Sequence, residues 1–153
     1  MRLTIAAILI SLPLCAELKR VEMTVGGLDC DSCALSVDRV VKRIRGVDTA
    51  EFDDKKKLVT VTFKPENKVT IAAIRDAVKG VGYTPGETKI TARGSLTQEG
   101  GEWHFLPSGW AGALKAEVPA EVRANAGIDV VIEGIVPEAA PDLVKVKSAK
   151  KAE

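Results

Sequence analysis

Two cysteines separated by two residues are the side chains best suited to do chemistry in this chain. Cys30 and Cys33 follow an apolar alternating run and precede a helical pattern. Thiols at the start of a helix lie beside unpaired backbone N–H groups and the positive end of the helix dipole, which favours thiolates. Two thiolates on one short loop suit a soft ion that accepts low coordination, so we expect one ion of Cu(I) or Hg(II) per chain.

Few further ligands are available to such a site. The third cysteine is Cys15, and His104 is the only histidine. A structural zinc site would need four ligands, so we expect an open, two-ligand site that can pass its ion on. His104 lies on a predicted strand, opposite the face of Trp103 and Phe105, and is most simply an exposed strand residue.

The cysteine pair has two other interpretations. It could form a structural disulfide that pins the loop of an interaction module, or it could exchange disulfides as a periplasmic redox protein, because both are possible in an oxidising compartment. Metal binding is favoured by the position of the pair on this loop. No nucleophile with a base, phosphate loop or carboxylate pair stands out, so we do not expect an enzyme.

Residues 1–16 have the pattern of a secretory signal peptide, with Arg2 before an apolar stretch and small Ala16 at its end. We therefore expect a mature chain that starts near Glu17, has lost Cys15 and is periplasmic. Lipidation of Cys15 is the alternative, but Pro13 and Leu14 fit it poorly. No later stretch is long and apolar enough to cross a bilayer, so the mature chain should be soluble and not membrane-spanning.

Hydrophobic periodicity predicts the elements around the cysteines. Apolar residues alternate with polar ones over 21–25, 50–52 and 59–63, which indicates strands, and recur at helical spacing over 37–44 and 71–78. A charged turn is expected at 53–57, and Thr70 can cap the second helix. Glycines end the first strand and both helices: Gly26, Gly27, Gly46, Gly80 and Gly82. With a strand after Tyr83, this order is that of a ferredoxin-like βαββαβ sandwich.

From residue 19 to 85, the chain resembles the heavy-metal-associated domain family. The likeness rests on Gly27-Leu-Asp-Cys-Asp-Ser-Cys33, on Gly46-Val47 and on Gly82-Tyr83. The family includes copper chaperones, amino-terminal modules of metal-transporting ATPases and the periplasmic mercuric-ion binding protein. The resemblance implies a metallochaperone-like role in metal ion transport, with a metal-transport membrane protein or another metal acceptor as partner.

The resemblance also assigns roles to single residues. It implies that Cys30 and Cys33 hold the metal, that Leu28 packs under the metal loop where the family usually has Met, and that Tyr83 covers the loop without ligating. Asp29 and Asp31 depart from the family pattern. Their charges would raise the pKa of the Cys30 thiol and oppose the helix dipole, although they could also attract a cation.

The remaining residues predict a second module. Five short alternating runs separated by Gly and Pro, with a short helix at 119–127 after the third, indicate a small all-β barrel of the OB type. A sandwich-like or SH3-like barrel is the alternative. We expect modules at 17–86 and 87–149 and a tail at 150–153, with the strand at 84–91 either completing the first module or shared. A formal net charge of +1 and an acidic excess after residue 87 argue against nucleic acid as a partner.

Overall fold

The computed structural model describes residues 17–27, 34–110 and 112–153. The predicted signal peptide at 1–16 and the stretch 28–33, with both predicted metal ligands, lie outside these ranges. Within them, no helix is long and apolar enough to cross a membrane.

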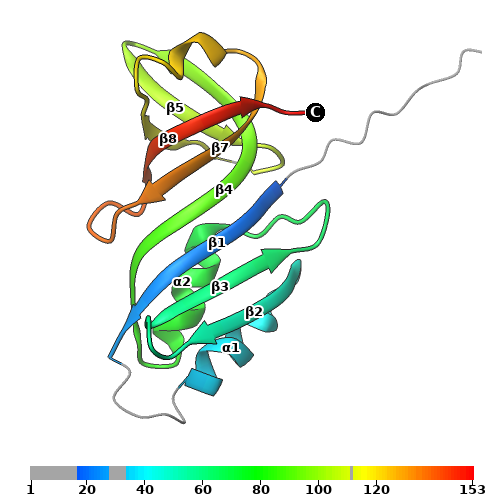
Figure 1. Ribbon diagram of the computed structural model, residues 1–153, viewed down its shortest axis with the longest axis vertical. Coiled ribbons are helices and arrows are strands. Elements are labelled where there is room, and N and C mark those ends of the chain that lie inside the picture. The colour runs from blue at the N-terminus through cyan, green and yellow to red at the C-terminus, as the bar shows by residue number, and fades with distance from the viewer. Residues whose placement is uncertain (1–16, 28–33, 111) are drawn as a thin grey trace, which may run out of the picture.

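The first half contains four antiparallel strands and two helices in the predicted βαββαβ order. In chain order they are β1 (Glu17–Gly26), α1 (Ala34–Lys42), β2 (Val47–Asp53), β3 (Leu58–Phe63), α2 (Ile71–Gly80) and β4 (Thr84–Glu99). The strands pair in the order β4-β1-β3-β2, and Figure 1 shows both helices behind this sheet. This arrangement is ferredoxin-like, as the sequence predicts.

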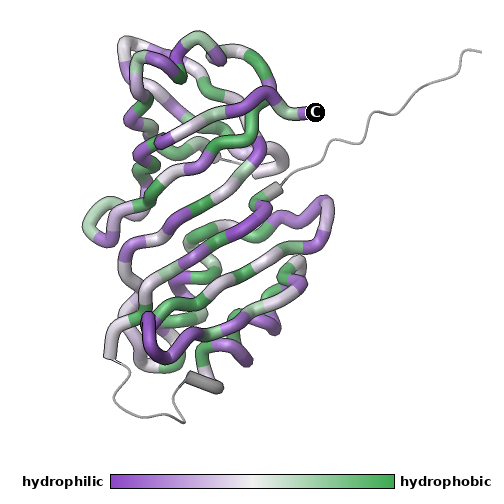
Figure 2. The backbone as a smooth tube through the Cα atoms, viewed as in Figure 1, coloured by the Kyte–Doolittle hydropathy of each residue, from purple (hydrophilic) through white to green (hydrophobic). Residues whose placement is uncertain are grey.

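Hydrophobic burial explains why these segments fold as they do. Val21 and Met23 on β1 are fully buried, and so are Val37 on α1 and Ile74 on α2, so the core lies between the sheet and the helices. Apolar and polar residues alternate along the strands in Figure 2, as a sheet with one buried face requires. Thr70 caps α2 as predicted, because its Oγ1 accepts a hydrogen bond from the Ala73 N–H at 3.1 Å.

Strand β4 is shared between the two halves of the chain. β1 pairs with it over Thr84–Arg93, β5 (Glu102–Pro107) continues along the same edge over Gly94–Glu99, and β7 (Asp129–Val136) takes the opposite edge over Thr88–Ser95. The sequence left open whether the strand at 84–91 completes the first module or is shared, and the structure shows that it is shared. Pro85 and Gly86 do not form a linker, because they lie inside a continuous strand.

The second half is rich in β-structure. Strands β6 (Leu114–Glu117) and β8 (Leu143–Lys151) complete a closed circuit in the order β4-β5-β6-β8-β7-β4. The β6–β8 pair is parallel, and the other pairs of the circuit are antiparallel. This circuit forms the upper half of the molecule in Figure 1.

Two predictions for the second half need correction. The helix predicted at 119–127 is a single 3₁₀ turn, η2 (Arg123–Asn125), because its N–H groups bond three residues back, as from Asn125 to Val122. The tail predicted at 150–153 is partly strand. Main-chain pairing does not depend on side-chain polarity, and the two lysines at the end of β8 pair with Val131 and Val130.

Candidate metal-binding loop

The predicted metal ligands Cys30 and Cys33, and the supporting Leu28, lie in the connection between β1 and α1 and outside the described residues. The structure does describe both flanks of this connection. Gly27 ends the first flank, and α1 begins at Ala34 on the second. The geometry of the flanks therefore defines where the connection starts and ends.

Tyr83 lies at the first flank. Its ring carbon Cδ1 is 3.9 Å from the position that a Cβ on Gly27 would occupy, and its N–H donates to the Val78 carbonyl at 3.3 Å. Gly27 has a φ of +80°, a left-handed conformation that suits glycine. A larger residue at Gly27 would be strained by this backbone conformation, whereas its Cβ would make only an ordinary contact with the tyrosine ring. The role of Tyr83 as a cover for the metal loop stays a prediction that this proximity supports.

The end of β1 is held from both sides. Gly26 pairs with Thr84 and Val25 with Pro85 on β4, while the Val25 N–H donates to the Lys57 carbonyl of the β2–β3 turn at 2.9 Å. The backbone that leads into the predicted metal loop is therefore anchored by the start of β4 and by the neighbouring hairpin.

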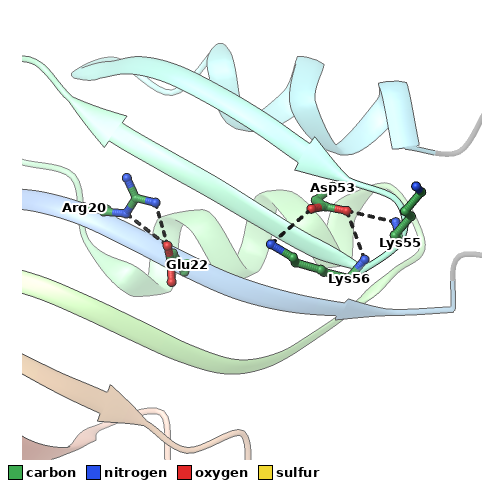
Figure 3. Close-up of polar contacts among 5 residues, drawn as sticks. All are labelled: Arg20, Glu22, Asp53, Lys55 and Lys56. Carbon is green, nitrogen blue, oxygen red and sulfur yellow. Dashed lines mark hydrogen bonds and ion pairs between the residues drawn. The ribbon is translucent and has the colours of Figure 1, made fainter.

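Asp53 organises that hairpin turn. Its Oδ1 accepts hydrogen bonds from the backbone N–H groups of Lys55 at 3.0 Å and Lys56 at 3.1 Å, and Figure 3 shows the Lys56 ammonium beside the same carboxylate. The Lys56 N–H is the main cause that lowers the pKa of Asp53, and the Lys56 charge adds to it. Asp54 pairs with Lys57 at 2.6 Å. The turn beside the loop is thus ordered, and its positive charge is partly balanced.

Asp38 on α1 has an unusual environment. Its Oδ1 is buried and has no hydrogen-bond partner among the described residues. Burial raises the pKa of this carboxyl, the nearby Lys42 opposes the shift, and Glu51 adds to it. An ionised carboxylate is therefore held at some cost on the helix that follows the cysteine pair.

His104 is not brought to the metal loop. It pairs with Thr97, which follows Thr84 by thirteen residues along β4, or about 40 Å of extended chain. The expected exposed position is wrong in part. His104 is half-buried between Thr97 and Lys115 of the flanking strands, and its buried Nδ1 finds no partner in the part of the chain described. The residues that the structure describes contain no group of three or more His, Cys, Asp or Glu that could hold a metal.

Sequence reasoning missed Arg75, which is only 6% exposed and contacts the start of β4. The signal was present in the spacing. Arg75 falls on the same α2 stripe as Ile71, Ile74 and Val78, where the helical period places buried residues. An arginine on such a stripe indicates a buried partner for its charge.

A ferredoxin-like sandwich with a cysteine pair between its first strand and first helix is the arrangement expected of a small metal-binding class of protein. The sequence model of the heavy-metal-associated domain matches residues 22–84. The mercuric transport protein periplasmic component of Shewanella putrefaciens is 36% identical over 76 residues, covering 50% of this chain and 82% of that protein. The chain belongs to the heavy-metal-associated domain family.

Other relatives differ in size and in the metal they are named for. The copper chaperone CopZ of Staphylococcus haemolyticus is 33% identical over 61 residues, which cover 40% of this chain and 88% of that protein. A zinc-transporting ATPase of Synechocystis is 36% identical over 74 residues, or 48% of this chain. The match spans only 10% of the ATPase. Each of these three matches therefore spans half of this chain or less.

Proposed function

We propose that this protein binds one soft metal ion, Cu(I) or Hg(II), through the thiolates of Cys30 and Cys33, and carries or scavenges it. The observation that carries the proposal is the position of the Cys-x-x-Cys pair. It falls in the connection between β1 and α1 of a heavy-metal-associated domain, whose first flank is packed against Tyr83. It is a binding protein and not an enzyme.

The choice of ion follows from ligand chemistry. The relatives are named for zinc, mercury and copper, so family membership leaves the metal open. Thiolates prefer soft ions, and Cu(I) and Hg(II) accept two ligands, whereas a structural zinc site is closed by four. Thiolate formation should also make binding weaker at acidic pH, because protons compete for the sulfurs.

Anaerobic titration of the reduced protein with Cu(I) or Hg(II), against a competing chelator, tests the proposal. Cys30→Ser and Cys33→Ser should each abolish tight binding, because one thiolate cannot hold the ion alone. His104→Ala is the matched control and should bind as the wild type does, because His104 lies far from the loop. Undiminished binding by Cys30→Ser would show that the metal site is elsewhere.

A redox role or a structural disulfide is the alternative, and the same preparation distinguishes them. A thiol–disulfide exchange protein would reduce or isomerise a test disulfide in the absence of metal. A purely structural pair would leave metal titration flat while its reduction lowered the unfolding temperature. Tight one-to-one binding with no exchange activity supports the carrier.

We also propose that the protein is exported to the periplasm, as its relative from Shewanella is named, and that residues 1–16 are removed on the way. The acceptor of the ion is then a metal-transport membrane protein or another metal-binding partner. The mass of the protein isolated from cells decides the first point. A chain starting at Glu17 supports export, and a chain retaining residues 1–16 contradicts it.

For the second half, we propose an OB-type barrel over 87–149, joined to a metal module over 17–86. Two observations support this division: the closed five-strand circuit and the 3₁₀ turn between its third and fourth strands. The barrel is an addition to the carrier in this proposal, because half of this chain or less already matches 82% of the mercuric relative and 88% of the copper relative.

A further inference from the structure

The start of β4 contains a bulge opposite the strand that leads into the metal loop. Met23 pairs with Thr88 and Val25 pairs with Pro85, so β4 has one more residue than β1 in this interval. Such a bulge leaves main-chain groups without a ladder partner and redirects the strand. Gly86 lies so close to Thr24 that a Cβ there would collide with the Thr24 hydroxyl.

Arg75 of α2 satisfies the carbonyl groups of this bulge. Its Nη1 donates to the Gly86 carbonyl at 2.9 Å and its Nη2 to the Pro85 carbonyl at 3.3 Å. The Thr88 hydroxyl donates to the same Gly86 carbonyl at 3.2 Å. A guanidinium offers several donors in a fixed plane, so it can hold two successive carbonyls that a regular strand would point in opposite directions.

The same guanidinium also reaches the second half of the chain. Its Nη2 donates to the Glu138 carbonyl at 3.4 Å, in the connection between β7 and β8. Arg75 is 6% exposed, and the acceptors of its hydrogen bonds to Pro85, Gly86 and Glu138 are main-chain carbonyls from two parts of the chain. A buried charge is costly unless its donors are satisfied. If Arg75 lost the Glu138 carbonyl, the guanidinium would have to shift to satisfy its free donor, and the Pro85 and Gly86 carbonyls bonded to it would shift as well.

We propose that Arg75 is a positioning residue for the metal loop. The β7–β8 connection holds the Arg75 guanidinium, Arg75 fixes the bulge of β4, and the bulge orients Val25–Gly27 and Tyr83. The proposal rests on the proposed function, because the loop positioned is the one that carries Cys30 and Cys33. It assigns the barrel a role in the carrier: its loop pre-organises the backbone on which the metal site is built. Loss of a group that hydrogen-bonds a metal ligand typically lowers affinity by about 10–100-fold, and Arg75 acts through the backbone one step further away, so we expect the lower end of this range.

Metal competition on the full chain is the first test. Arg75→Met keeps length and apolar bulk but removes the donors, and Arg75→Lys keeps only a point charge. A third variant replaces residues 137–142 by an Asn-Gly turn, which leaves Arg75 intact and removes the Glu138 carbonyl. All three should bind Cu(I) about tenfold more weakly than the wild type. Glu138→Ala should bind normally, because only the main chain of Glu138 is used.

Amide hydrogen exchange of the metal-free protein is the second test, and it does not depend on the identity of the ion. Exchange at Val25–Gly27 and Thr84 should be about tenfold faster in Arg75→Met and in the loop replacement, the change expected when one stabilising contact is lost. Gly101→Ala is the control. Gly101 has a φ of +88° in the β4–β5 turn, so alanine weakens the barrel without touching Arg75.

The outcomes separate this inference from the proposed function. A wild type that binds no soft metal contradicts the function, and the exchange data still decide whether Arg75 positions the loop. Equal metal affinity and equal exchange in the wild type and in both the Arg75→Met and loop variants overturn the inference. So does a loss in Gly101→Ala as large as in the loop replacement, because the effect would then be one of general stability.

Discussion

Three polar residues are buried in the described part of the molecule: Asn67, Arg75 and Thr88. All three bond to main-chain carbonyls where the backbone is irregular. Asn67 donates to the carbonyls of Leu18 at 3.1 Å and Lys64 at 2.9 Å, and so ties the connection before α2 to the start of β1. Arg75 and Thr88 serve the bulge of β4 in the same way. Single polar side chains therefore fix both ends of the strand pair that leads into the predicted metal loop.

Asp38→Asn should stabilise the protein at neutral pH. Burial raises the pKa of the Asp38 carboxyl above its usual 3.8, so the folded state prefers the neutral form and ionisation lowers the free energy of unfolding. Removing the charge should add about 0.5 kcal/mol, the scale of a partly exposed site. The gain should shrink as the pH falls through the folded-state pKa of Asp38, where the wild type becomes protonated. Thermal unfolding at neutral and acidic pH measures both effects.

Asp53→Asn should lower the free energy of unfolding at neutral pH, and it serves as the comparison for Asp38→Asn. The pKa of Asp53 lies below 3.8 because the Lys56 backbone N–H and charge favour the carboxylate. Its contribution to stability is present at neutral pH and is lost as the pH falls through its lowered pKa. The variant should be less stable than the wild type at neutral pH and equal to it in strong acid. If both variants changed stability in the same direction at neutral pH, the assigned environments would be wrong.

At the scale of elements, β4 carries the most constraints. Its sixteen residues pair with three other strands. Strand β4 must therefore bend, because it pairs with β1 in the ferredoxin-like sheet and with β5 and β7 in the closed circuit. Gly94 lies where β4 passes from β1 to β5. A Cβ there would meet the Leu106 carbonyl and would lie 2.8 Å from the Phe105 ring and from the Pro107 Cα. The close approach of backbones at the bend requires a glycine.

Gly94→Ala should therefore destabilise the protein strongly, by about 2 kcal/mol or more, because the methyl group meets backbone that cannot move aside. Gly80→Ala is the matched control, since a Cβ at Gly80 meets nothing within 4 Å. Denaturant unfolding of the two variants measures the difference. Equal midpoints for both variants would mean that the approach of β5 to β4 at Gly94 is not as close as described.

The sequence predicts the elements of this fold well where periodicity alone determines them. Alternation identifies β1 and β3, and the helical stripe identifies α2, because each has one buried face. Continuity of β4 could not be predicted, since Pro85 and Gly86 usually end a strand and are accommodated here by a bulge bonded to Arg75. The candidate site is predicted from Cys30 and Cys33, whereas its support by Arg75 depends on contacts between distant segments.

At the scale of the whole molecule, sharing β4 changes what the two halves can do. In a four-stranded βαββαβ sheet of order β4-β1-β3-β2, β4 is an edge strand. Here β7 pairs along that edge, and β2 is left as the open edge of the described sheet, with Asp48 and Glu51 exposed on it. Charged edge strands resist pairing with another chain. Pairing with β7 thus closes one edge of the ferredoxin-like sheet, and exposed charges protect the other edge.

A shared strand should also make the two halves unfold together. Both α-helices that the structure describes lie in the first half, whereas both tryptophans, Trp103 and Trp110, lie in the second. The helical signal in far-ultraviolet circular dichroism therefore reports on the first half, and tryptophan fluorescence reports on the second. Neither half can lose β4 and keep its sheet, so we expect the two signals to give coincident denaturant transitions.

The Gly94→Ala variant extends this test. Because its clash lies on the barrel side of β4, an autonomous barrel would show a lower midpoint in tryptophan fluorescence only, with the helical signal unchanged. In a molecule united by β4, the destabilisation is transmitted, and both midpoints fall by the same amount. Two separated transitions in the wild type, or a shift confined to one signal in the variant, would show that the first half is stable without the second. Coincident shifts would instead make the metal loop, the bulge at Gly86 and the barrel parts of one cooperative structure.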